Sequence, residues 1–284
     1  MTTILGIDAA WTATQPSGIA LVQQQGTRWR CIDAAPSYAS FIERADGLLP
    51  DWTRTAIGSV PDPARLLQAA TQLAGEPPAL VTLDMPVATT QINGRRAADR
   101  EVSRTFGAQW CSAHSPGPLR PGPLGAELSR QFSEAGYPIA TATTPAGTPH
   151  RLVEVYPHPA LLALLRRDRR VPYKVGKASS YWKGAPVADR IERLLTEFAA
   201  ILAGLATHID DIAIPLPDAA EVRSLAALKP FEDAIDALVC CWVGCEYLAG
   251  RCHPLGDETA AVWCPRERQS SHGGTPKPPR HPIE

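Results

Sequence analysis

Acidic residues inside apolar segments are the feature of this sequence that points most directly to chemistry. Asp8 lies in the first hydrophobic run, between Ile7 and Ala9, and Asp84 ends a second run that continues into Met85. An ionised carboxylate is costly to bury without a cation or a strong hydrogen-bond donor beside it. A shared divalent metal ion would stabilise several such carboxylates together, so we expect a metal site.

Three more acids occur in similar apolar surroundings further along the chain. Glu154 lies in the run 151–157, and Asp233 and Asp236 lie near the start of an apolar helical segment, 230–239. Residues three apart share one face of a helix, so these two aspartates should point in the same direction. The predicted catalytic residues are therefore Asp8, Asp84, Glu154, Asp233 and Asp236, and the four aspartates are the predicted metal ligands.

Each acid also has a structural explanation that needs no metal. Asp8 can pair with an arginine, and Asp84, which precedes Met85 and Pro86, can be a turn residue at the end of a strand. Asp233 falls in the first turn of a helix, where the helix dipole favours acids. The constellation as a whole favours the metal site, because no structural role explains all five acids together.

Composition and charge limit the classes of function. The 284 residues carry a formal net charge of only −1 and are 44% hydrophobic, which is typical of a soluble globular protein. No apolar run approaches the roughly 20 residues needed to cross a bilayer, and no signal segment precedes the first strand, so we expect a cytoplasmic protein. Any nucleic-acid contact must use local basic surface, and the oligomeric state stays open.

The elements that must position these acids follow from the pattern of apolar residues. Residues 4–34 contain three strand-like runs separated by short turns, which predicts an antiparallel meander. Residues 80–84 and 152–156 predict two further buried strands, and 187–202 has the spacing of an amphipathic helix. The fold class is therefore α/β, with a sheet flanked by helices.

One domain accounts for most of the chain. We predict a single domain over residues 1–265, interrupted by a helical and proline-rich insertion at about 89–149 that lies over the site. The polar tail at 266–284 is rich in proline and glycine, and we expect it to be disordered.

Several short motifs resemble, in their order, the predicted ribonuclease H-like nuclease family known as domain of unknown function 429 (DUF429). The resemblance covers about residues 4–250. The motifs are Gly6-Ile7-Asp8, Leu83-Asp84-Met85-Pro86, Gly94-Arg95 with Asp99, Glu154-Val155-Tyr156-Pro157, Tyr173-Lys174 and Asp233-Ala234-Ile235-Asp236-Ala237-Leu238.

The resemblance implies a ribonuclease H-like sheet, with three antiparallel strands followed by parallel ones, and a divalent-metal-dependent nuclease. Asp8 takes the place of the first-strand ligand, and Asp233 and Asp236 look like the late-helix pair of Holliday-junction resolvases of the RuvC kind. Two ions about 3.5–4 Å apart would activate water and stabilise the leaving oxygen. Carboxylate ligands suit Mg²⁺ or Mn²⁺, and the implied partner is DNA or RNA.

Basic residues near these motifs are candidates for binding the substrate. We predict that Lys174 and Arg95 bind the phosphate of the nucleic acid; the alternative is that they only neutralise the acid cluster. Arg96 is expected to belong to a solvated face. The chain departs from well-known nucleases in carrying Asp84 where many have Glu, in adding Glu154, and in placing His158 where relatives have an acid.

Two other functions compete with the nuclease. The first is a non-catalytic nucleic-acid or nucleotide-binding protein on the same fold. The second is an actin-like ATPase or sugar kinase, a class that shares this strand order and also has an acid on the first strand. It has less support, because such enzymes hold ATP phosphates with a glycine-rich hairpin after that acid. Here Asp8 is followed by Ala9, Ala10 and Trp11 instead.

Overall fold

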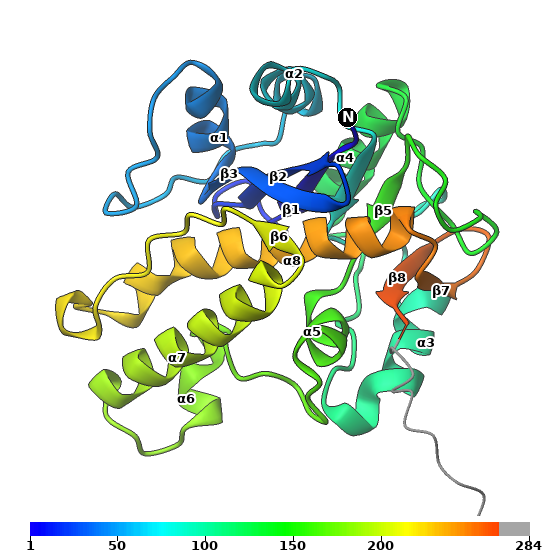
Figure 1. The fold of residues 1–284 in the computed structure, drawn as a ribbon. Helices are drawn as coiled ribbons and strands as arrows, with labels where there is room; N and C mark the ends of the chain where they lie inside the picture. Colours follow the sequence, from blue (N-terminus) through cyan, green and yellow to red (C-terminus); the bar gives the residue numbers. More distant parts are fainter. Residues whose placement is uncertain (267–284) are drawn as a thin grey trace, which may run out of the picture.

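The computed structural model describes residues 1–266, and its centre is one eight-stranded mixed sheet (Figure 1). The strands lie in the order β6-β3-β2-β1-β4-β5-β8-β7. Their bounds are β1 Thr3–Asp8, β2 Gly18–Gln25, β3 Arg28–Ala35, β4 Leu80–Leu83, β5 Leu152–Glu154, β6 Ile209–Asp210, β7 Cys252–Gly256 and β8 Ala261–Pro265. Except for Arg266, the tail predicted to be disordered lies outside the described residues.

The direction of the strands agrees with the predicted mixed sheet. β1, β2 and β3 pair antiparallel, whereas β4 pairs parallel to β1, and β5 and β8 continue in parallel. The pairs β3·β6 and β7·β8 were not predicted. β6 is only two residues long and β7 contains Pro254, so neither has the apolar pattern of a strand.

The described part of the chain has eight α-helices, most of which pack around the sheet, whereas α6 lies beside α7 (Figure 1). They are α1 Tyr38–Ala45, α2 Pro63–Ala74, α3 Ala97–Phe106, α4 Pro123–Glu134, α5 Pro157–Leu165, α6 Ala178–Tyr181, α7 Val187–Ala206 and α8 Lys229–Leu248. The helices α3 and α4 lie in the predicted insertion at 89–149. No helix among residues 1–266 is long and apolar enough to cross a membrane.

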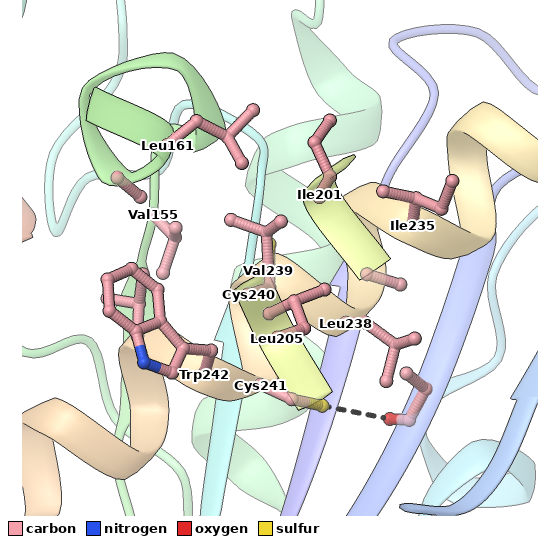
Figure 2. Packing of buried hydrophobic residues seen from close by; sticks show 14 of the residues in the cluster. Val155, Leu161, Ile201, Leu205, Ile235, Leu238, Val239, Cys240, Cys241 and Trp242 are labelled. Atoms are coloured by element: carbon pink, nitrogen blue, oxygen red, sulfur yellow. Dashed lines mark hydrogen bonds between the residues drawn. The ribbon is translucent and has the colours of Figure 1, made fainter. Parts of the chain in front are cut away.

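The core has two main parts, one on each face of the sheet. On one face, α8 packs against the strands together with α5 and α7, as Figure 2 shows for Leu238 and Val239 of α8 beside Ile201 and Leu205 of α7. On the other face, α1, α2 and α4 pack against alternate residues of the same strands. Helix α8 is buried along almost its whole length, from Pro230 onward.

Two glycines let the backbone of α8 lie directly on the sheet. A Cβ atom on Gly6 would lie 2.4 Å from the carbonyl oxygen of Ala237, and one on Gly18 only 1.9 Å from that of Asp233. Gly18 is the cross-strand partner of Asp8. The close approach therefore places the start of α8 over the carboxyl end of β1.

Candidate active site

A cleft of about 620 Å³ opens at the carboxyl ends of β1, β4 and β5. This is the edge at which α/β sheets usually bind ligands. Among the predicted site residues, those that line the cleft are Asp8, Asp84, Glu154 and Lys174. The insertion contributes Ala113, His114, Ser115 and Arg120 to the same cleft.

Asp8 and Asp84 end adjacent parallel strands. Their preceding residues, Ile7 and Leu83, are paired in register, and the amide of Asp84 donates to the carbonyl of Ile7 at 2.8 Å. Gly6, two residues before Asp8 on β1, faces α8. Because alternate residues of a strand point to the same face, Asp8 also points toward α8. Asp84 is its neighbour on the adjacent strand and points the same way. The two carboxylates therefore share one face of the sheet.

These two carboxylates are open to a ligand. Within residues 1–266, neither Asp8 nor Asp84 forms an ion pair or a side-chain hydrogen bond, although the cations Lys174 and Lys229 lie in the same region. Burial, followed by the negative charge of Asp8, raises the pKa of Asp84 well above its usual range. A cation between the two side chains would relieve this repulsion.

Glu154 lies on the opposite face of the sheet from the two aspartates. It pairs in register with Leu83, whose side chain packs on the α1 and α2 side. Arg96 binds its carboxylate with two hydrogen bonds of 2.6 Å, and the amide of Val87 donates to it at 3.1 Å. Arg96 also binds Asp99 at 2.7 Å, so Glu154 belongs to a buried ion-pair network.

The expectation that Arg96 is solvated was wrong. Its side chain is only 7% exposed, because Glu154 and Asp99 both draw the guanidinium inward. Arg95, which was predicted to bind substrate, is exposed and does not line the cleft. Its guanidinium donates to the Ser103 hydroxyl and to the carbonyl of Asp99.

Both carboxylate oxygens of Asp236 are already engaged. The Tyr173 hydroxyl donates to Oδ1 at 2.5 Å, and the Lys174 ammonium group binds Oδ2. Burial of the Asp236 side chain raises its pKa to about 7, although Lys174 opposes the shift. Lys174 also lies 3.5 Å from Glu232, so this lysine joins two acids of α8 and presents its charge to the cleft.

Asp233 is bound on one side only. Lys229 binds its Oδ1, whereas its Oδ2 is buried and has no hydrogen-bond partner within residues 1–266. Glu232, which was not predicted as a site residue, accepts from Lys229 at 2.7 Å and from the amide of Val175 at 2.5 Å. The buried Oδ2 of Asp233 lowers the stability of the fold unless a ligand binds to it.

The donor atoms suit a hard cation that binds few protein ligands. No group of three or more His, Cys, Asp or Glu side chains within residues 1–266 is arranged to hold a metal ion. Mg²⁺ is commonly bound by one or two carboxylates together with waters and substrate phosphates. The open carboxylates of Asp8 and Asp84, with the free Oδ2 of Asp233 nearby, fit that pattern.

His158 is a further buried polar group in the cleft. It is 3% exposed, its ring lies edge-on to Tyr156 and Tyr173 at 5.3 and 5.5 Å, and its Nδ1 has no hydrogen-bond partner within the described chain. Burial lowers the pKa of His158 well below its usual value, so the imidazole is neutral at pH 7. The sequence indicated only that a histidine replaces an acid here.

Comparison with known proteins gives one match. A family model described as a protein of unknown function, DUF429, matches residues 6–261, which include the strand-end acids and α8. Neither the comparison with curated proteins nor that with solved structures gives a match.

Proposed function

The chain belongs to the DUF429 family, and we propose that it is a divalent-metal-dependent nuclease that hydrolyses a phosphodiester bond of nucleic acid in this cleft. The observation that carries the proposal is the pair of strand-end carboxylates, Asp8 and Asp84, which share one face and lack any ion pair within residues 1–266. Lysine and arginine side chains line the same cleft, as a polyanionic substrate requires.

The arrangement of elements supports a ribonuclease H-like fold for this proposal. Three antiparallel strands come first, the fourth strand lies next to the first, and a late helix carries acids across the sheet. Asp8 at the end of β1 and Asp84 after β4 take the positions expected from that resemblance. Glu154 is the exception, because Arg96 holds it on the other face.

In the proposed site, Asp8 and Asp84 would hold the cation, and the unpartnered Oδ2 of Asp233, whose carboxyl senses the charge of Asp8, could add a further oxygen. When bound, the ion would polarise the phosphoryl group and lower the pKa of a water molecule. Lys174, fixed by Asp236 and Glu232, presents a positive charge that stabilises the negative charge developing on the phosphate.

The test is cleavage of a panel of single- and double-stranded DNA and RNA with Mg²⁺ or Mn²⁺. We expect wild-type cleavage that a chelator stops, and a loss of at least about 10³-fold for Asp8→Asn, because a metal ligand contributes several kcal/mol to the transition state. Asp168→Asn, an exposed change outside the cleft, is the matched control. Wild-type protein that cleaves nothing with either metal would contradict the proposal.

One observation favours a second function, a nucleic-acid or nucleotide-binding protein without catalysis. The three acids near the start of α8, Glu232, Asp233 and Asp236, are each bound by a lysine, and no three-ligand metal site is formed within residues 1–266. In that case Asp8→Asn would leave nucleic-acid binding unchanged, and chelation of metal would have no effect on it.

A further inference from the structure

One wall of the cleft is formed by cations that have no acidic partner. This basic wall consists of Arg120, Arg170, Lys177 and His114, which come from the proline-rich loop, the segment after α5 and the segment before α6. Within residues 1–266 none of the four forms an ion pair. The other cations of the cleft, including Arg96 and Lys174, are all paired with carboxylates.

The members of the basic wall lie close enough to act on one another. Burial, followed by the charges of Arg170, Lys177 and Arg120, lowers the pKa of His114. The Nε of Arg170 is buried without a hydrogen-bond partner in the described chain, and so is Nδ1 of the neighbouring His158. Converging cations with unsatisfied donors are unfavourable unless an anion binds among them.

We infer that the basic wall is a subsite for the terminal phosphate of a nucleic-acid strand. A terminal phosphate monoester carries about −1.5 to −2 charges at pH 7, whereas each internal phosphodiester carries one. Three permanent cations that line one cleft therefore favour the monoester. Arg170 supplies planar donors suited to phosphate oxygens, and Lys177 supplies a mobile point charge.

The size of the cleft agrees with the end of a single strand. Its volume of about 620 Å³ is that of a pocket for one small ligand, for which roughly 300–1,000 Å³ is usual. Trp11 lines the cleft with the Arg120 guanidinium 6.0 Å from its ring centre, which offers a surface for a base. That this end belongs to a strand cleaved at Asp8 and Asp84 rests on the proposed function.

The first experiment measures binding of inorganic phosphate to the full chain, without metal, by calorimetry. We expect Arg170→Gln and Lys177→Gln each to weaken binding about tenfold, because each removes a charged hydrogen bond. Arg169→Gln is the control, because Arg169 stacks on Trp110 outside the cleft. Near-ultraviolet circular dichroism checks the fold, and Lys177, being exposed, gives a variant that leaves the core intact.

The second experiment uses short oligonucleotides with a 5′-phosphate, a 3′-phosphate or neither, titrated in the presence of EDTA. We expect one phosphorylated form to bind about tenfold more tightly than the unphosphorylated one, and the difference to vanish in Arg170→Gln. The two phosphorylated forms distinguish which end of the strand enters the cleft.

The subsite is overturned if all three oligonucleotides bind equally, or if Arg169→Gln weakens phosphate binding as much as Arg170→Gln. Its failure is separate from that of the nuclease, since both titrations omit metal and cleavage. End-dependent binding without any cleavage would support the subsite and contradict the nuclease. Cleavage of unphosphorylated strands at the same rate as phosphorylated strands would support the nuclease and contradict the subsite.

Discussion

The strand-end acids and the acids of α8 border one cleft but are in opposite electrostatic states. Asp8 and Asp84 have no ion pair within residues 1–266, whereas Asp233 and Asp236 are each bound by a lysine. Both sets lie on the same face of the sheet, and their like charges raise the pKa of Asp84 and of Asp236 beyond the effect of burial. Aspartates that border one cleft therefore differ in role, depending on whether a lysine already neutralises them.

The comparison teaches that acids near one another are not equivalent candidates for a metal. An ammonium group that already fills the space beside a carboxylate must move before a cation can bind there. We therefore assign binding of the cation to the strand ends, and the positioning of Lys174 to Asp236 and Glu232. Four predictions test this division, from the largest expected effect to the smallest.

Lys174, which binds Asp236 of α8, should be essential for stability. Replacing Lys174 by Met leaves Asp236 buried without its cation, which should lower the free energy of unfolding by about 3–5 kcal/mol in urea denaturation. Adding Asp236→Asn to the same chain should restore much of the loss. If the single variant loses less than about 1 kcal/mol, the helix acids are not fixed by this pair.

Metal should act at the strand ends. Mg²⁺ at about 100 times its dissociation constant should raise the free energy of unfolding by about 2.7 kcal/mol, measured by denaturation with and without metal. Asp8→Asn should remove this increment, whereas Glu154→Gln should keep it, because Glu154 lies on the other face with Arg96. Equal loss in both variants would place Glu154 in the metal site.

Removing a strand-end charge should stabilise the protein without metal. Asp84→Asn should raise the free energy of unfolding by about 1 kcal/mol at pH 7.5, because it removes the cost of ionising, or keeping protonated, a carboxyl that is buried and lies near Asp8.

The same variant has an expected dependence on pH. The raised pKa of Asp84 means that the folded state keeps its proton when the unfolded state has lost it, so the wild type loses stability as pH rises above about 4. The gain from Asp84→Asn should thus be absent at pH 3.5 and grow toward neutral pH in thermal melts. A constant gain would point to packing instead of charge.

The smallest effect concerns the two adjacent arginines. Arg95→Ala should change stability by less than about 0.5 kcal/mol and leave nucleic-acid binding unchanged, because the side chain is exposed and does not line the cleft. Arg96→Met should instead destabilise the fold, as it leaves Glu154 and Asp99 unpaired. Weakened binding in Arg95→Ala would restore Arg95 as a substrate contact.

Local sequence was sufficient to place β1 to β5 and their acids, but not β6 or β7. The apolar run around Asp8 and the proline after Met85 locate two strand ends, and Pro63 after Asp62 marks the start of α2. The parallel pairing of the later strands was implied by the resemblance to DUF429, because the apolar runs alone do not give the direction of a strand.

The charge state of the site was not predictable, because it depends on contacts distant in sequence. Lys174 meets Asp236 across 62 residues, and Arg96 meets Glu154 across 58. Arg96 belongs to a run of basic residues, which predicts a solvated face. Only the fold shows that its side chain meets Glu154 and Asp99. Likewise, only the register of β4 with β5 shows that Glu154 points away from Asp84.

The contact between Gly18 and α8 bears on the size of the ion that the proposed site would hold. A Cβ on Gly18 would lie 1.9 Å from the backbone oxygen of Asp233. The contact between the backbones of β2 and α8 therefore sets the distance from α8 to Asp8, the cross-strand partner of Gly18. Side-chain rearrangement cannot widen that spacing. A rigid cage selects by ionic radius: Mg²⁺ takes oxygens at about 2.0–2.1 Å, Ca²⁺ at about 2.3–2.6 Å. If Asp233 on α8 joins Asp8 in the proposed site, the close contact of Gly18 with the helix backbone would favour the smaller ion.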